Sequence, residues 1–171
     1  SFECWVDASH AGEWDKKEAP DDPATAKSRS GYAITLGGCP ILWASKLQTE
    51  IALSSTEAEY IAMSQAMREV IPLMALVREA AAQGVIDEPG VPKVHCKVFE
   101  DNSGAIEITR LPKMRPWTKH LNIKYHHFRD QVARGRITIH FVPTADQIAD
   151  ILTKPVPIEL LTRFRGRLMG W

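Results

Sequence analysis

Residues 31–45 read GYAITLGGCPILWAS, and they set the fold class because they carry the pattern of a tight β-hairpin. Two apolar runs, Tyr32–Leu36 and Ile41–Ser45, are joined through Gly37 and Gly38. Consecutive glycines are favoured in the short turns between antiparallel strands, because glycine adopts positive φ angles at little steric cost. The stretch therefore predicts two paired strands.

More strands are predicted on both sides of this hairpin. FECWVD (residues 2–7) alternates in part and ends on an acid, VHCKVFED (residues 94–101) ends on two acids, and residues 137–142 form another strand-like run. From Thr56 to about Gln83, apolar residues recur at threes and fours, which predicts a long amphipathic helix. Shorter helices are predicted over residues 102–111, 120–135, 145–154 and 157–169. This order favours an α/β fold, a mixed sheet with helices on its faces.

Composition restricts the functional classes without choosing one. The 171 residues are 44% apolar and 25% charged, which predicts a single globular domain over residues 1–171. Lysine plus arginine and aspartate plus glutamate number 21 each, so no global charge predicts a nucleic-acid or membrane partner. Three cysteines without C-x-x-C spacing favour a reducing, intracellular compartment, and no apolar run is long enough to cross a bilayer. A chain that opens on Ser1 is consistent with a piece of a longer protein.

The stretch LSSTEAEYIA, residues 53–62, places two glutamates at the start of the long helix. Ser54 with Glu57, and Thr56 with Glu59, each fit the capping box, in which a glutamate satisfies a backbone N–H at the helix start. Taken alone, the stretch favours capping over catalysis for both glutamates.

Acids also stand at the ends of several other predicted elements. Asp7 ends the first strand, Glu57 lies at the start of the long helix, Asp101 ends the fourth strand, and Asp146 or Asp150 lies near the start of a later helix. If four such carboxylates converge, cations must offset their repulsion, and hard oxygen ligands suit Mg²⁺ or Mn²⁺. Two ions about 4 Å apart would support phosphoryl displacement. The alternative is that each acid is an unrelated strand-end or cap residue.

A resemblance distinguishes these alternatives. In order along the chain, the sequence contains WVDASHAG, SRSGYAITLGGCPILWASKLQ, ALSSTEAEYIAMSQAMRE, EDNSGAIEI, KHLNIKYHHFRDQV and ADQIADILTKPVP. Together these segments resemble the ribonuclease H domain of copia-type retrotransposon Pol polyproteins over nearly the whole chain. The resemblance implies the ribonuclease H fold, a five-stranded mixed sheet in the order 3-2-1-4-5 flanked by helices. It also implies a domain from the C-terminal part of a polyprotein, which cuts the RNA strand of RNA/DNA hybrids with two Mg²⁺ ions, replaceable by Mn²⁺.

The same resemblance assigns the metal ligands and catalytic residues. Asp7 in WVDAS, Glu57 in TEAEY, Asp101 in EDNSGAI and Asp150 in IADILTK match the family's four carboxylates. Glu59 lies two residues beyond Glu57, about 200° around a helix, so the two cannot share one site. We therefore expect Glu57 to bind metal and Glu59 to serve as a cap or a surface contact.

Two neighbouring acids receive structural roles. Glu100 is expected to point to the opposite face of the sheet from Asp101, because successive strand residues alternate. Asp146 is expected to interact with a helix dipole.

The sequence departs from the family pattern in two places. Cellular ribonucleases H carry a histidine in the loop before the last helix, and residues 142–147 read VPTADQ without one. The loop over residues 12–30 is also longer than the usual connection in the family, and its role stays open.

Candidate nucleic-acid contacts fall in two regions. The basic segment 110–136 favours phosphate binding with one aromatic platform, and a solvated helix face is the alternative reading. Polar residues beside the expected metal ligands favour contacts to 2′-hydroxyls, and helix capping is their alternative role. The expected nucleic-acid-binding residues are Ser54, Ser55, Asn102, Ser103, Lys113, Arg115, Trp117 and Lys119.

These observations predict an endoribonuclease acting during retrotransposon reverse transcription. The expected partners are an RNA/DNA hybrid and the reverse transcriptase domain of the same polyprotein, with no membrane contact. The expected location is intracellular, in a cytoplasmic virus-like particle if the element is active. Two alternatives remain, a DNA nuclease of integrase type and a catalytically inactive module of the same fold that binds hybrids or tethers a polyprotein.

Overall fold

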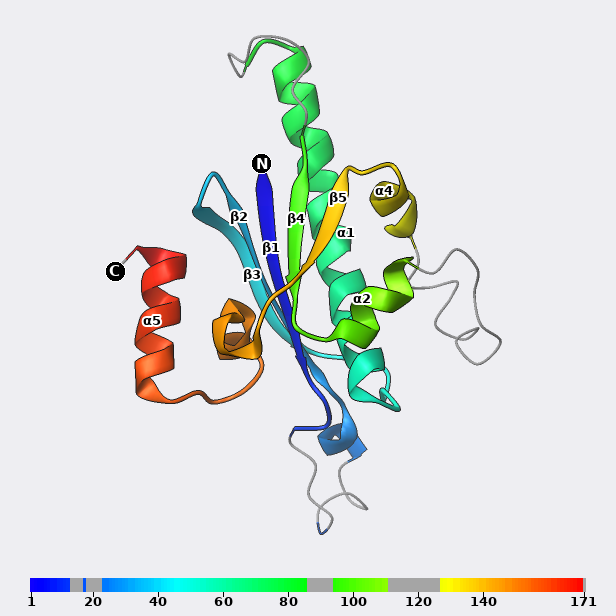
Figure 1. Cartoon of the computed structure of the whole chain (residues 1–171), viewed down its shortest axis with the longest axis vertical. Coiled ribbons are helices and arrows are strands. Elements are labelled where there is room, and N and C mark those ends of the chain that lie inside the picture. The colour runs from blue at the N-terminus through cyan, green and yellow to red at the C-terminus, as the bar shows by residue number, and fades with distance from the viewer. Residues whose placement is uncertain (13–16, 18–22, 86–93, 111–126, 171) are drawn as a thin grey trace.

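The computed structural model describes residues 1–12, 17, 23–85, 94–110 and 127–170. Its centre is one five-stranded sheet (Figure 1). The strands are β1 (Phe2–Ser9), β2 (Arg29–Leu36), β3 (Cys39–Leu47), β4 (Cys96–Glu100) and β5 (Ile137–Phe141), in the order β3-β2-β1-β4-β5. The predicted mixed α/β sheet and its strand order are therefore confirmed.

The hairpin β2–β3 forms as its sequence predicts. Gly37 and Gly38 both have positive φ angles, 59° and 84°, and Leu36 pairs directly with Cys39 across the turn. Two successive positive φ angles match the right-handed twist of the flanking strands, which is why the glycine pair suits this position. The strands β1 to β3 are antiparallel, whereas β1–β4 and β4–β5 are parallel.

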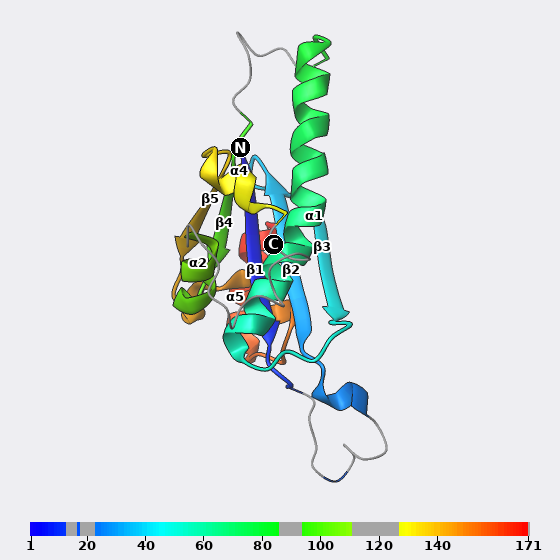
Figure 2. The same cartoon turned by 90° about the vertical axis from the view of Figure 1, so that its right-hand side faces the viewer.

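One face of the sheet is covered by the long helix α1 (Ser55–Ala82), with α2 (Ser103–Arg110) and α4 (Arg129–Ala133) beside it (Figure 2). Alternate residues of β1 point into the core under α1, among them Phe2, Cys4 and Val6. This alternation leaves Trp5 on the opposite face, and Asp7 has the same strand parity as Trp5.

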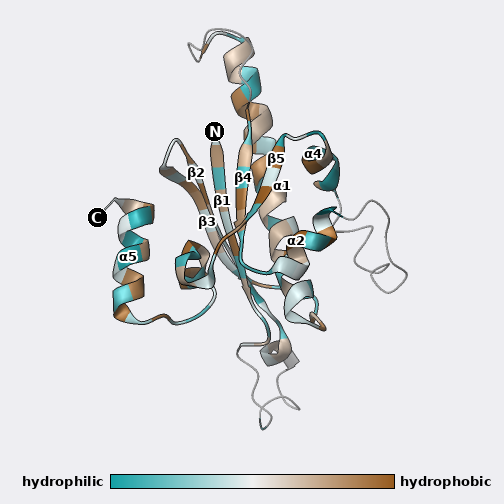
Figure 3. Cartoon of the chain, viewed as in Figure 1, coloured by the Kyte–Doolittle hydropathy of each residue, from teal (hydrophilic) through white to brown (hydrophobic). Residues whose placement is uncertain are grey.

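The second face is covered by the C-terminal segment. Helix α5 (Ile158–Met169) packs Phe164 and Leu168 in a smaller core with Trp5 and Ala33. Figure 3 shows apolar residues along the strands and alternating polar and apolar residues on α5, as expected for a helix with one buried face. This element confirms the helix predicted over residues 157–169.

The segment 145–154 differs from its prediction as one helix. It forms two 3₁₀ helices, η3 (Thr144–Asp146) and η4 (Ile148–Leu152), separated by Gln147 in an extended conformation. The buried Gln147 side chain donates to the carbonyls of Val6 at 2.8 Å and Phe99 at 3.3 Å. These bonds draw the chain onto β1 and β4 and interrupt a continuous helix at this residue.

Gly31 on β2 explains how η4 can lie so close to the sheet. A Cβ on Gly31 would lie 2.6 Å from the Thr153 methyl carbon and 2.8 Å from Leu152 Cβ, so η4 approaches β2 closely enough to require glycine.

The helix predicted over residues 120–135 is described only in part. The described part contains α4, and residues 120–126 lie outside the described residues. No helix in the described ranges is both long enough and apolar enough to span a bilayer.

Candidate metal centre

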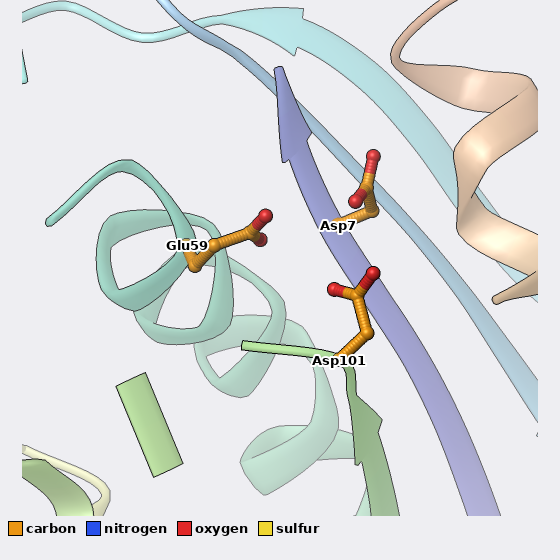
Figure 4. Close-up of side chains that lie close together, drawn as sticks. All are labelled: Asp7, Glu59 and Asp101. Carbon is orange, nitrogen blue, oxygen red and sulfur yellow. The ribbon is translucent and has the colours of Figure 1, made fainter. Parts of the chain in front are cut away.

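Three acids from three elements meet at one end of the sheet. Asp7 comes from β1, Glu59 from the first turns of α1, and Asp101 directly follows β4. One carboxylate oxygen of each lies within 4.8 Å of the others. Figure 4 shows Glu59 pointing from the helix toward the two aspartates at the strand ends. Because β1 and β4 are parallel neighbours, their carboxyl ends fall at the same edge, which explains the convergence of Asp7 and Asp101.

The two glutamates occupy positions opposite to those expected from the sequence. Glu57 caps the helix, because its Oε2 accepts the backbone N–H of Leu53 at 3.0 Å and its own N–H donates to Ser54 Oγ at 3.1 Å. Glu59 is buried and joins the acid cluster. The two side chains therefore lie in different surroundings, and Glu59, rather than the expected Glu57, lies with Asp7 and Asp101.

Packing of the whole helix explains this reversal. Positions three, four, seven and eleven beyond Glu59 are the buried residues Ala62, Met63, Ala66 and Val70. The row that begins at Glu57 is also buried at Tyr60, Ile61 and Ser64, but it reaches the exposed Arg68 eleven residues on, where the row from Glu59 is still buried at Val70. The sheet-facing side of α1 therefore carries Glu59. The signal was present in the sequence as the apolar row that continues from Glu59.

Asp7 is buried, with 2% of its surface exposed, and the Thr153 hydroxyl donates a hydrogen bond to its Oδ2. Burial raises its pKa to about 6, although the bond from Thr153 opposes the shift, and Asp150 and Asp101 add to it by like-charge repulsion.

Glu59 also has a raised pKa, first through burial and then through the negative charges of Glu100, Asp7 and Asp101. Its Oε2 is buried with no hydrogen-bond partner among the described residues. A buried carboxylate oxygen without a donor, beside two other carboxylates, fits a divalent cation with a preference for hard oxygen ligands. The residues present therefore suit Mg²⁺ or Mn²⁺.

The acids next to Asp101 lie in different surroundings. Glu100 is fully buried on the same face as Cys96 and Val98, as strand alternation predicts, and its Oε1 accepts the N–H of Asn102 at 3.0 Å. Asp101 is partly exposed, and its Oδ2 accepts a 2.6 Å hydrogen bond from the Thr144 hydroxyl of η3. Thr144 and Thr153 thus each hold one aspartate, and no motif in the sequence predicts either role.

Comparison with known proteins adds a second line of evidence. No protein-family model matches the chain. The chain is 35% identical over 168 residues to the "Retrovirus-related Pol polyprotein from transposon RE2" of Arabidopsis thaliana, covering 98% of the chain and 10% of that protein. It is 33% identical over 153 residues to the corresponding TNT 1-94 polyprotein of Nicotiana tabacum, covering 90% of the chain and 10% of that protein. The chain belongs to the copia-type Pol family. It spans about a tenth of the length of these relatives.

Solved structures show the fold of this copia-type Pol segment independently. The N-terminal RNase H domain of rv2228c from Mycobacterium tuberculosis superposes with a TM-score of 0.56 at 14% identity, covering 89% of each chain. LC11-RNase H1, isolated from compost, superposes with the same TM-score at 15% identity, covering 90% of this chain and 92% of that one. The predicted ribonuclease H fold is confirmed.

The fourth expected carboxylate, Asp150, lies beside the cluster of Asp7, Glu59 and Asp101. Asp150 is buried, and its Oδ1 lies 2.9 Å from the ammonium of Lys154. Burial raises its pKa, the contact with Lys154 opposes the shift, and the charge of Asp101 adds to it. Asp146, by contrast, is exposed and lies 3.7 Å from Arg163 on the surface.

The expected nucleic-acid contacts of the Pol segment divide into three groups. Ser54 and Asn102 are engaged as caps, since Ser54 Oγ accepts the N–H of Glu57 and Asn102 Oδ1 accepts the N–H of Ala105 at 3.0 Å. Ser55 and Ser103 are exposed at the starts of α1 and α2. The other four expected residues lie outside the described part of the chain: Lys113, Arg115, Trp117 and Lys119.

Proposed function

We propose that the chain is a metal-dependent endoribonuclease that hydrolyses the RNA strand of RNA/DNA hybrids during retrotransposon reverse transcription. The observation that carries this proposal is the convergence of Asp7, Glu59 and Asp101 at one end of a ribonuclease H fold. Membership of the copia-type Pol family supports the biological context. The solved structures that share this fold are RNase H proteins, which supports the reaction class.

In this proposal Asp7, Glu59 and Asp101 hold divalent metal, and Asp150 is the fourth carboxylate. Bound Mg²⁺ would supply an activated water and neutralise the leaving oxygen of the phosphodiester. The chain's own residues keep the ligands in place. Thr153 orients Asp7, Thr144 orients Asp101, and the packing of α1 directs Glu59 toward the cluster.

The exposed Ser55 and Ser103 beside this cluster are proposed to contact the hybrid, where a 2′-hydroxyl distinguishes RNA from DNA. The basic residues Lys113, Arg115 and Lys119, with Trp117, are proposed as backbone contacts. We further propose that residues 1–171 act as one domain beside the reverse transcriptase of the same polyprotein, inside the cell and within a cytoplasmic virus-like particle in an active element.

The two glutamates offer a matched test of the proposal. End-labelled RNA/DNA hybrid is incubated with the chain and Mg²⁺ or Mn²⁺, beside duplex DNA, duplex RNA and single strands. We expect cleavage of the RNA strand of the hybrid, loss of cleavage in Glu59→Gln and Asp101→Asn, and retention in Glu57→Gln. Binding of hybrid without cleavage would favour an inactive binding module instead. Cleavage of duplex DNA would favour a DNA nuclease of integrase type.

A further inference from the structure

Lys154 places a positive charge beside the acid cluster. Its Nζ lies 2.9 Å from Asp150 Oδ1, and the two side chains differ in exposure, with 43% of Lys154 and 7% of Asp150 accessible. The similarly spaced pair Arg134–Asp130 is exposed on both sides, at 59% and 56%. The ion pair of Lys154 therefore has one buried member and one exposed member. In an ordinary surface ion pair, both members face solvent.

The local structure explains why Lys154 reaches this position. The hydroxyl of the preceding residue, Thr153, donates to Asp7 Oδ2 and also lies 3.2 Å from the carbonyl oxygen of Asp150, so its one hydrogen is shared between the two acceptors. These bonds attach the end of η4 to the cluster and leave the next side chain beside the same acids. Gly31 allows this approach, because a larger residue there would collide with η4.

The electrostatic surroundings agree with this geometry. Burial lowers the pKa of Lys154, but the close contact with Asp150 and the charges of Asp7, Asp150 and Asp101 outweigh it, so the net pKa is raised. Lys154 thus remains an ammonium beside three carboxylates. Divalent ions that enter the cluster would replace part of its neutralising role, because they carry the larger charge.

We propose that Lys154 is an additional catalytic residue, which neutralises Asp150 in the free protein and turns to the scissile phosphate when a hybrid is bound. This inference rests on the proposed function. In the hydrolysis, the oxygen of water forms a bond to phosphorus, the bond from phosphorus to the 3′ oxygen breaks, and that oxygen takes up a proton. The products carry a 5′-phosphate and a 3′-hydroxyl. The ammonium of Lys154 contacts the non-bridging oxygens, where negative charge increases in the transition state.

Two variants of Lys154 separate its charge from its size. Lys154→Met keeps the length of the side chain without the charge, and Lys154→Arg keeps the charge. Lys97→Met is the control, since Lys97 is an exposed lysine on β4. The first measurement is Mg²⁺ binding to the free 171-residue protein by calorimetry. The second is the single-turnover rate of hybrid cleavage at saturating protein, with hybrid affinity measured separately in Ca²⁺.

In Lys154→Met we expect Mg²⁺ to bind roughly 2- to 5-fold more tightly, because the Lys154 ammonium no longer competes with Mg²⁺ for Asp150. The size of the effect is that of a partly exposed ion pair. The single-turnover rate should nevertheless fall by about 10- to 100-fold, as when a charged contact to the transition state is removed. Lys154→Arg should recover part of the rate, and Lys97→Met should match the wild type in both measurements.

The outcomes distinguish this inference from the proposed function. If the wild type cuts hybrid and Lys154→Met cuts it equally fast, only the inference is refuted. An unchanged Mg²⁺ affinity in Lys154→Met would refute the inference that Lys154 competes with Mg²⁺ for Asp150. A wild-type protein that cuts no hybrid refutes the proposed function and this inference together.

Discussion

Replacing Asp7 by asparagine should stabilise the metal-free protein above about pH 6. Asp7 is 2% exposed, and its pKa is raised from 3.8 to about 6, mainly by burial. The difference is roughly two pKa units, and at about 1.4 kcal/mol per unit it corresponds to about 3 kcal/mol of lost stability in the ionised state. Asparagine removes the charge and keeps an oxygen that accepts the hydrogen bond from Thr153.

The direction of the pH dependence follows from proton binding. Because the pKa of Asp7 is higher in the folded than in the unfolded chain, the folded chain binds more protons between about pH 4 and pH 6. The contribution of Asp7 to the stability of the folded chain is therefore fully present below about pH 4 and is lost as the pH rises through about 6. Asparagine does not titrate, so the advantage of the variant should be near zero at pH 4 and should reach its maximum above pH 6.

Urea unfolding in EDTA, followed by tryptophan fluorescence between about pH 4 and pH 8, measures this difference. Glu59 and Glu100 are present in both proteins, so the difference reports the charge of Asp7 together with its repulsion on these two carboxylates. Asp146→Asn is the control, because the side chain of Asp146 is 52% exposed, and its stability should match the wild type. Added Mg²⁺ should stabilise the wild type more than the variant at pH 8. An Asp7→Asn variant that is less stable at pH 8, or a difference that is the same at pH 4 and pH 8, would refute the reasoning.

Three other substitutions test the supports of the site. Glu57→Ala should cost about 1 kcal/mol of unfolding free energy through the lost cap while cleavage persists, which urea unfolding and the hybrid assay together check. Gly31→Ala should cost about 1–3 kcal/mol by pushing η4 off the sheet, whereas Gly166→Ala, with open space around its Cβ, should be neutral or slightly stabilising in thermal unfolding. Gln147→Leu should cost about 1–3 kcal/mol in the same measurement, because the carbonyls of Val6 and Phe99 lose the buried amide that donates to them.

Local patterns in the sequence predicted the five strands, whereas their order in the sheet followed from the resemblance to the ribonuclease H domain. The glycine pair at 37 and 38 fixes the turn, and the alternation in β1 and β4 fixes which residues face α1. The 3₁₀ segments could not be predicted in this way, because the interruption at Gln147 depends on carbonyls of Val6 and Phe99, which lie far away in the sequence. The same is true of Thr144 and Thr153, whose roles depend on the aspartates that the fold brings to them.

The choice between Glu57 and Glu59 depends on two patterns of different length, the capping pattern of the first helical turn and the apolar pattern over several turns. Both glutamates fit the same capping pattern, and capping concerns only the first turn of a helix. The face of α1 that meets the sheet is set over several turns by Ala62, Met63, Ala66 and Val70, and Glu59 belongs to that row. A helix rotated to bring Glu57 inward would turn these apolar residues toward solvent, and its cost would exceed the roughly 1 kcal/mol that a cap contributes. Where two acids compete for a site at the start of a helix, the apolar row that continues from one of them is therefore the stronger evidence.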